Sequence, residues 1–263
     1  MGYENDLNSS GYTVLENYIS QEQIKKYLEI TEKVVGDIGA NASASPTGSQ
    51  KIIKNDRIVN NIHFHNEEFL DLVSHGSHIN ILAEFLNDEW YGIIPKDKPN
   101  FILAQCNCRE SSTALPYHVD VRLKLPSTQS WSMQCILALE DRTSTNGGLA
   151  VIEGSHLSDF IPADRINRDD EKFVNLKAGD MVIFHSHLHN ATTELVHGEK
   201  PGWGLLLTYR RWWCKPQFDF IKMFSKVRIE HMDDVKKTLL GYYCQPPSDC
   251  FASPSARQGY SSE

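Results

Sequence analysis

The sequence predicts a mainly β protein with flanking helices, in which helices come first and a β-sandwich or barrel follows. Two patterns support this class: helical spacing of apolar residues before residue 100, and short apolar runs separated by turn residues from Phe101 to Trp213. The chain has 263 residues, of which 40% are hydrophobic and 23% charged, as expected of one globular domain. We expect a single domain over 1–263, with a helical part (1–100), a β core (101–213), and a C-terminal helix and tail (214–263).

The helical part begins with a clear capping signal. Ser20 followed by Gln23 forms a capping box, and apolar residues recur at helical spacing from Ile24 until Gly36, where we expect the helix to stop. Two shorter helices are expected over 69–73 and 79–86, interrupted at Gly76.

The β core is predicted from runs of apolar and β-branched residues. Asn146-Gly147 is a strong turn signal between two of these runs. After the core, a helix is expected over 233–240, packed on the core, with a frayed end. The predicted strands are Phe101 to Gln105, Tyr117 to Leu125, Trp131 to Leu139, Leu149 to Ile152, Met181 to His185, and Trp203 to Tyr209.

The charge of the chain argues against two classes of partner. A formal net charge of −8 leaves no bulk cationic surface for phosphates or anionic lipids, so neither nucleic acid nor membrane partners are expected. The first ten residues lack the pattern of a signal peptide, and no apolar run is long enough to span a bilayer. We therefore expect a cytoplasmic monomer or homodimer.

The residues His118-Val119-Asp120 carry the strongest chemical signal. On a strand, side chains two residues apart point to the same face, so an imidazole and a carboxylate would converge on one ion. A second histidine would complete the two-histidine, one-carboxylate triad that binds iron(II) with open coordination positions. His231-Met232-Asp233 has the same spacing, but it opens a predicted helix and no histidine follows it. Histidines downstream of Asp120 are His185, His187 and His189.

The chain from Leu7 to about Trp213 resembles the phytanoyl-CoA dioxygenase family of iron(II)- and 2-oxoglutarate-dependent oxygenases. Four pieces occur in family order: Gly11-Tyr12-Thr13-Val14-Leu15; Pro116-Tyr117-His118-Val119-Asp120; Asn146-Gly147-Gly148 through Gly154-Ser155-His156-Leu157; and Ala178-Gly179-Asp180 through His185. The resemblance implies a double-stranded β-helix, or cupin-like jelly roll. It also implies iron(II), 2-oxoglutarate as co-substrate and dioxygen, with a small-molecule substrate.

The resemblance implies that His118, Asp120 and His189 hold the metal. His189 is preferred because His189-Asn190-Ala191-Thr192 best matches the small residues that follow the family's distal histidine; His187 ranks next and His185 last. His156 belongs to a turn that the family uses structurally. An alternative from the residues is a three-histidine site of His185, His187 and His189, as in zinc or cupin-like enzymes.

The anchor for the C5 carboxylate of 2-oxoglutarate departs from the family pattern. No arginine stands near the start of the strand after His189, so Lys200 is the nearest candidate by spacing and Arg122 is the second. We expect Gln105, on the strand before the triad, to help orient the co-substrate. Asp120 disfavours halogenation, since related halogenases carry a small residue there. We expect hydroxylation or further oxidation of a small organic molecule, with 2-oxoglutarate decarboxylated to succinate. A non-catalytic jelly-roll binding protein is the remaining alternative.

Overall fold

The computed structural model describes residues 2–38, 57–92, 94–110, 113–121, 130–158 and 165–245. Strands in these ranges form a six-stranded sheet of order β1-β8-β5-β10-β3-β2 and a four-stranded sheet of order β4-β9-β6-β7. The predicted mainly β class with flanking helices is thus confirmed. The strands are β1 Tyr12–Leu15, β2 Arg57–Asn60, β3 Phe101–Glu110, β4 Leu115–His118, β5 Ser132–Ala138, β6 Leu149–Ile152, β7 Glu171–Val174, β8 Met181–His185, β9 Asn190–Thr192 and β10 Trp203–Arg211.

The described helices gather before β3 and after β10. The predicted helices 69–73, 79–86 and 233–240 correspond to α4, α5 and α8, which confirms them. No helix in the described ranges has both the length and the apolar character needed to cross a membrane. The helices are α1 Gly2–Ser9, α2 Gln21–Ile38, α3 Ile62–His65, α4 Glu67–His75, α5 His78–Leu86, α6 Phe220–Met223, α7 Lys226–Glu230 and α8 Asp234–Leu239.

The chain divides into two compact units. The first comprises the described parts of Met1–Ile62, Cys106–Gln129 and Gln134–Leu206, and the second those of His63–Gln105, Ser130–Met133 and Leu207–Glu263. The expectation of one domain over 1–263 stays a prediction.

The core of the first unit lies between strands of both sheets. Val182 and Phe184 on β8 alternate with residues that face away, and they pack with Leu149 and Val151 of β6. All five residues of β8 are buried, so this strand is covered on both faces. The cluster also includes Ala138, Val174, Leu176 and Leu188, with Tyr12, Val14 and Ile136 against it.

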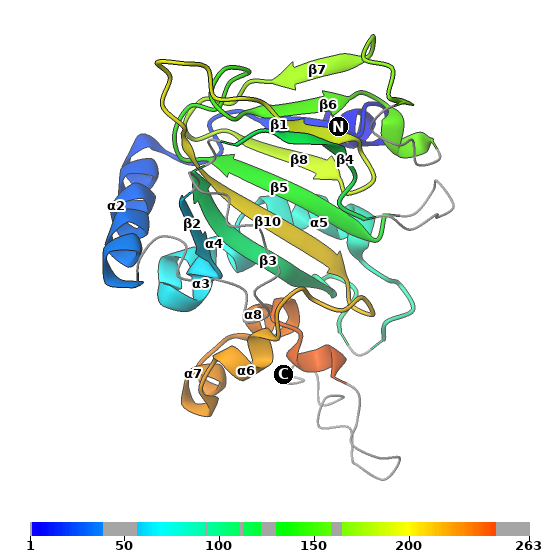
Figure 1. Cartoon of the computed structure of the whole chain (residues 1–263). Helices are drawn as coiled ribbons and strands as arrows, with labels where there is room; N and C mark the ends of the chain where they lie inside the picture. The colour runs from blue at the N-terminus through cyan, green and yellow to red at the C-terminus, as the bar shows by residue number, and fades with distance from the viewer. Residues whose placement is uncertain are drawn as a thin grey trace. The chain divides into compact units, whose positions relative to one another are not determined.

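Helix α2 lies beside β2 in the first unit (Figure 1). Its capping box is present: Ser20 N donates to Gln23 Oε1 at 2.9 Å, and Gln23 N donates to Ser20 Oγ at 3.2 Å. The helix nevertheless continues to Ile38, so the expected stop at Gly36 is wrong. A single glycine inside a helix costs only about 1 kcal/mol relative to alanine, which a well-capped helix with a buried face tolerates.

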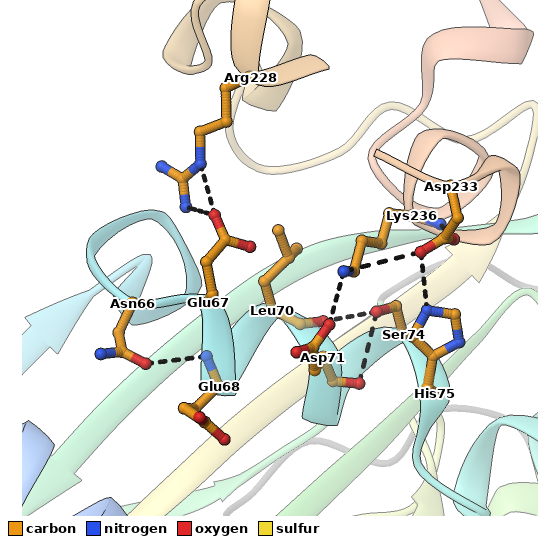
Figure 2. Close-up of polar contacts among 10 residues, drawn as sticks. All are labelled: Asn66, Glu67, Glu68, Leu70, Asp71, Ser74, His75, Arg228, Asp233 and Lys236. Carbon is orange, nitrogen blue, oxygen red and sulfur yellow. Dashed lines mark hydrogen bonds and ion pairs between the residues drawn. The ribbon is translucent and has the colours of Figure 1, made fainter. Parts of the chain in front are cut away.

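In the second unit, ion pairs fasten the C-terminal helices to α4 (Figure 2). Arg228 of α7 donates from Nε to Glu67 at 2.8 Å, and its Nη2 lies 2.6 Å from the same oxygen. Lys236 of α8 pairs with Asp71 at 2.5 Å and with Asp233 at 3.6 Å. Helix α8 therefore packs against helix α4, whereas we expected it to pack on the β core. The predicted frayed end lies largely outside the described residues.

Several short elements have no clear signal in the sequence. Strand β9 has three residues, and only Val174 of β7 is buried. The predicted strand over 117–125 is shorter than expected, since β4 ends at His118. Residues 122–125 of that prediction lie outside the described residues. Elements this short contain too few residues to show a periodicity. For the same reason the sequence pattern does not predict α1, α6, α7 or β2.

Candidate metal centre

His118, the last residue of β4, and Asp120, two residues beyond it, face each other. His118 Nε2 lies 3.8 Å from Asp120 Oδ1, and the two side chains are 30% and 29% exposed. The other ring nitrogen, Nδ1, lies 2.8 Å from the carbonyl oxygen of Pro116. Because a carbonyl oxygen can only accept, Nδ1 carries the hydrogen and the lone pair of a neutral ring is on Nε2. The histidine therefore presents a metal-binding nitrogen toward the carboxylate.

The backbone of Asp120 is held by the segment that follows β8. Asp120 N and Val121 N both donate to the carbonyl oxygen of Ser186, at 3.0 and 3.2 Å. Gln134 on β5 donates to Ser186 Oγ at 3.3 Å. We expected both His118 and Asp120 to lie on one strand, but Asp120 follows the strand's last residue. The Ser186 carbonyl, rather than ladder pairing, thus fixes the main chain at Asp120.

Asn190, the first residue of β9, contacts the second oxygen of Asp120. Its Nδ2 donates to Asp120 Oδ2 at 3.1 Å, and the two strands are in register with His118 opposite Asn190. Asp120 therefore directs one oxygen to an amide donor and the other toward His118. Metal-binding carboxylates commonly show this division, with a hydrogen bond from the surrounding residues fixing their orientation.

His189 immediately precedes Asn190 and is 1% exposed. Its backbone N donates to Ser155 Oγ at 2.9 Å, and its carbonyl accepts from Ile152 N at 2.9 Å. It is thus one residue from the ladder partner of His118. Within the described ranges, no three His, Cys, Asp or Glu side chains form a closed cluster that could hold a metal ion. His118 and Asp120 are therefore a two-ligand half-site, with His189 adjacent in register.

The other two downstream histidines have different surroundings. The His185 ring stacks on that of His156, with ring centroids 4.8 Å apart and an angle of 15° between the planes. Burial, followed by the nearby His156 and His187, lowers the pKa of His185 to about 3. His187 is half-buried. No cluster of His185, His187 and His189 is present among the described residues, so the three-histidine alternative has no geometric support.

The half-site fits iron(II) by its donor chemistry. A neutral imidazole nitrogen and a carboxylate oxygen are two of the three donors in the triad that non-haem iron enzymes use. Both side chains are partly exposed, so an ion could approach them. His189, the third predicted ligand, immediately precedes β9.

Lys200 is not brought to this end of the first unit. Three residues later, Trp203 accepts from Leu139 N and donates from its backbone N to Glu140 Oε2. Gln134 of β5 contacts Ser186 beside the half-site. It lies six residues before Glu140, which follows the end of the same strand. At about 3.3 Å per residue, this separation is roughly 20 Å. Lys200 is also exposed. Spacing in the sequence had suggested the lysine, but the strand order directs its loop to the opposite end.

The two other anchor candidates fall elsewhere. Gln105 belongs to the second unit, where its Oε1 accepts from Thr208 Oγ1 at 3.3 Å. Arg122 lies outside the described residues.

Sequence reasoning missed the residues that surround the half-site. Asn190 was noticed only as one of the small residues after His189, and Gln134 and Ser186 were not singled out. Ser155 was treated as part of a structural turn, yet its hydroxyl binds the main chain of His189. Polar residues inside apolar runs, such as Gln134 between Met133 and Cys135, were the available signal.

Solved structures with the same fold include several iron and 2-oxoglutarate enzymes. HygX from Streptomyces hygroscopicus, with nickel and 2-oxoglutarate bound, matches with a TM-score of 0.62 and 11% identity over 81% of this chain and 88% of that one. The α-ketoglutarate-dependent epimerase SnoN from nogalamycin biosynthesis matches with a TM-score of 0.60 and 15% identity over 80% and 79%. The carbocyclase SnoK of the same biosynthesis gives 0.59 and 16% over 80% and 83%. The predicted jelly-roll fold is thereby confirmed.

The sequence itself matches a family model. Residues 7–195 match the model described as phytanoyl-CoA dioxygenase, which covers most of the chain. No curated protein matches the sequence significantly. The chain therefore belongs to the phytanoyl-CoA dioxygenase family, whose members are non-haem dioxygenases that use iron(II), 2-oxoglutarate and dioxygen.

Proposed function

We propose that His118, Asp120 and His189 hold one iron(II), and that the protein hydroxylates, or further oxidises, a small organic molecule. In this reaction 2-oxoglutarate is decarboxylated to succinate. The observation that carries the proposal is the pair of facing donor atoms, His118 Nε2 and Asp120 Oδ1, at 3.8 Å.

Each ligand has a defined task in this proposal. His118 would bind the metal through Nε2, because the Pro116 carbonyl accepts the hydrogen on Nδ1. Asp120 supplies the single negative charge that offsets part of the metal's charge. His189 supplies the second nitrogen from a buried position. Bound iron(II), with 2-oxoglutarate and dioxygen, supplies the oxidising power for attack on a C–H bond.

The reaction type follows from the retained carboxylate. Asp120 occupies the position where halogenases of related type carry a small residue, so we propose hydroxylation or further oxidation rather than halogenation. Structures of similar fold include HygX with hygromycin B and SnoN with nogalamycin RO. By analogy with those two proteins, we propose a small natural-product-like molecule as the substrate of this chain.

We propose Arg122 as the partner of the C5 carboxylate of 2-oxoglutarate. It stands two residues after Asp120 in the sequence, and an arginine can bind a carboxylate through two parallel hydrogen bonds. Lys200 is less suitable because Trp203, three residues after it, donates to Glu140, which follows the end of β5.

The experiment that tests the proposal is substrate-independent succinate formation. Protein supplied with iron(II), 2-oxoglutarate and dioxygen should form succinate slowly, and Asp120→Ala should not. The matched control is Lys200→Ala, which changes an exposed charge away from the half-site. A screen of candidate small molecules for faster, oxygen-dependent succinate formation then identifies the substrate. Metal binding without succinate formation under any condition would instead favour the non-catalytic binding protein.

A further inference from the structure

We propose that Asn190 is a positioning residue, whose side-chain amide determines which oxygen of Asp120 is offered to the metal. This inference rests on the proposed function. The observation behind it is the 3.1 Å hydrogen bond from Asn190 Nδ2 to Asp120 Oδ2, whereas the ring nitrogen His118 Nε2 lies 3.8 Å from the other carboxylate oxygen, Oδ1.

The surroundings of the amide determine its orientation. Three oxygen atoms lie around Asn190 Nδ2: Asp120 Oδ2 at 3.1 Å, the Leu188 carbonyl at 3.2 Å and the His118 carbonyl at 3.5 Å. All three can only accept, so an amide turned the other way would place its own oxygen against them. The nitrogen has two hydrogens, and the two shorter contacts use them. One of its hydrogen bonds is therefore committed to the carboxylate.

Hydrogen bonds hold both the main chain and the side chain of Asp120. Its backbone N donates to the Ser186 carbonyl at 3.0 Å, and its Oδ2 receives the Asn190 amide. The terminal torsion of an aspartate is otherwise broad, so without the amide the carboxylate could exchange its two oxygens or present both. A hydrogen bond to an ionised carboxylate is about twice as strong as one between neutral groups. The Asn190 contact is thus strong enough to select one rotamer.

A fixed carboxylate has a direct consequence for the metal. With the Asn190 amide on Oδ2, Asp120 turns Oδ1 toward the His118 ring, an orientation that favours binding a metal through this one oxygen. The facial triad leaves positions open for co-substrate and dioxygen only if the carboxylate does not bind through both oxygens. We infer that Asn190 keeps Asp120 a one-oxygen ligand.

A purely structural role for Asn190 makes a different prediction. Two of its three contacts are to backbone carbonyls, so the residue could serve only to tie β9 to β4. In that case its replacement would lower the stability of the fold but leave the metal affinity of the folded protein unchanged. The two roles are therefore separated by measuring metal affinity and apo-protein stability together.

The test uses two replacements and a matched control. Asn190→Ala removes the amide, and Asn190→Leu removes it while keeping much of the side-chain volume. If one variant does not fold, the other can still be measured. The control is Asn146→Ala in the same unit. Asn146 is also buried and donates through Nδ2, to the Asp141 carbonyl at 2.8 Å, but it sits in a turn with no contact to Asp120. Thermal unfolding without metal reports the structural cost in each variant.

The decisive measurement is a titration with Co²⁺ alone, followed by the visible absorption of the bound ion, which is sensitive to coordination number. We expect both Asn190 variants to bind Co²⁺ roughly 10–100-fold more weakly and with an altered spectrum, as replacing partners of metal ligands generally does. Asn146→Ala should lose stability but keep wild-type affinity and spectrum. Unchanged affinity and spectrum in the Asn190 variants would overturn the inference and leave the proposed function standing. Wild-type protein that binds no Co²⁺ would overturn both.

Discussion

The two ends of the ladder between β6 and β9 use polar residues in opposite ways. At the end beside His118, the amide of Asn190 bonds to the side chain of Asp120. At the other end, buried Arg142 donates to the backbone carbonyls of Gly202 and Gly147, at 2.7 and 2.6 Å. Polar groups at the far end are therefore used to close turns, whereas those at the near end orient another side chain. Sequence spacing alone, as used for Lys200, is therefore a weaker guide to function than the contacts that a side chain makes.

The largest expected effect concerns the third ligand at the near end. His189→Ala should abolish iron binding and turnover, because two ligands alone leave the ion weakly held, while His187→Ala should largely spare both. Iron content after anaerobic loading and succinate formation are the measurements. The opposite result would show that His187, two residues earlier in the chain, is the third ligand.

A second prediction asks which of two cationic side chains binds the co-substrate. Arg122→Ala should weaken 2-oxoglutarate binding by roughly 2–5 kcal/mol, because it leaves a carboxylate unpaired in a water-poor site. Lys200→Ala, the charge-removing control at the far end, should bind 2-oxoglutarate as the wild type does. Titration calorimetry with iron-loaded, oxygen-free protein measures both. If Lys200→Ala were the weaker binder, the contrast between the two ends would be wrong.

A substitution at the end of the ladder near Arg142 should lower the free energy of unfolding without changing metal binding. Arg142→Leu leaves two buried carbonyls without their donors, at a cost of about 3 kcal/mol in the free energy of unfolding. Denaturant titration measures this loss, and metal affinity of the folded variant should equal that of the wild type. A comparable loss of metal affinity would show that the two ends are coupled.

A smaller effect concerns a buried histidine of the second unit. His63 in the second unit is fully buried, with its ring 4.7 Å from that of Phe220, and burial lowers its pKa from 6.5 to about 3. Because the folded-state pKa is below the unfolded one, the neutral ring stabilises the fold fully above pH 6.5, and this contribution is lost as the pH falls toward 3. Between pH 6.5 and 5 the loss is about 2 kcal/mol.

The variant that checks this effect is His63→Leu, which should reduce the pH dependence of the unfolding free energy over that range. Equal slopes in wild type and His63→Leu would mean that His63 is not buried as a neutral ring.

Much of this architecture was accessible from the sequence, and the exceptions have physical causes. β6 and β8 were predicted with their observed bounds because their apolar runs are bounded by turn residues. The convergence of His118 and Asp120 was also predicted, although from strand alternation rather than from the Ser186 carbonyl that holds the main chain. Asn190 could not be predicted as a partner of Asp120, because that contact depends on the register between β4 and β9, which lie about seventy residues apart in the chain.

The most direct test of the central claim is anaerobic addition of iron(II) and then 2-oxoglutarate to the protein, followed by visible absorption. Chelation of protein-bound iron(II) by a 2-oxo acid produces a charge-transfer band that neither partner shows alone. The account predicts this band in the wild type, with one iron per chain, and its loss in His118→Ala and Asp120→Ala. A wild type without the band, or variants that retain it at full intensity, would contradict the assignment of iron(II) and 2-oxoglutarate to this half-site.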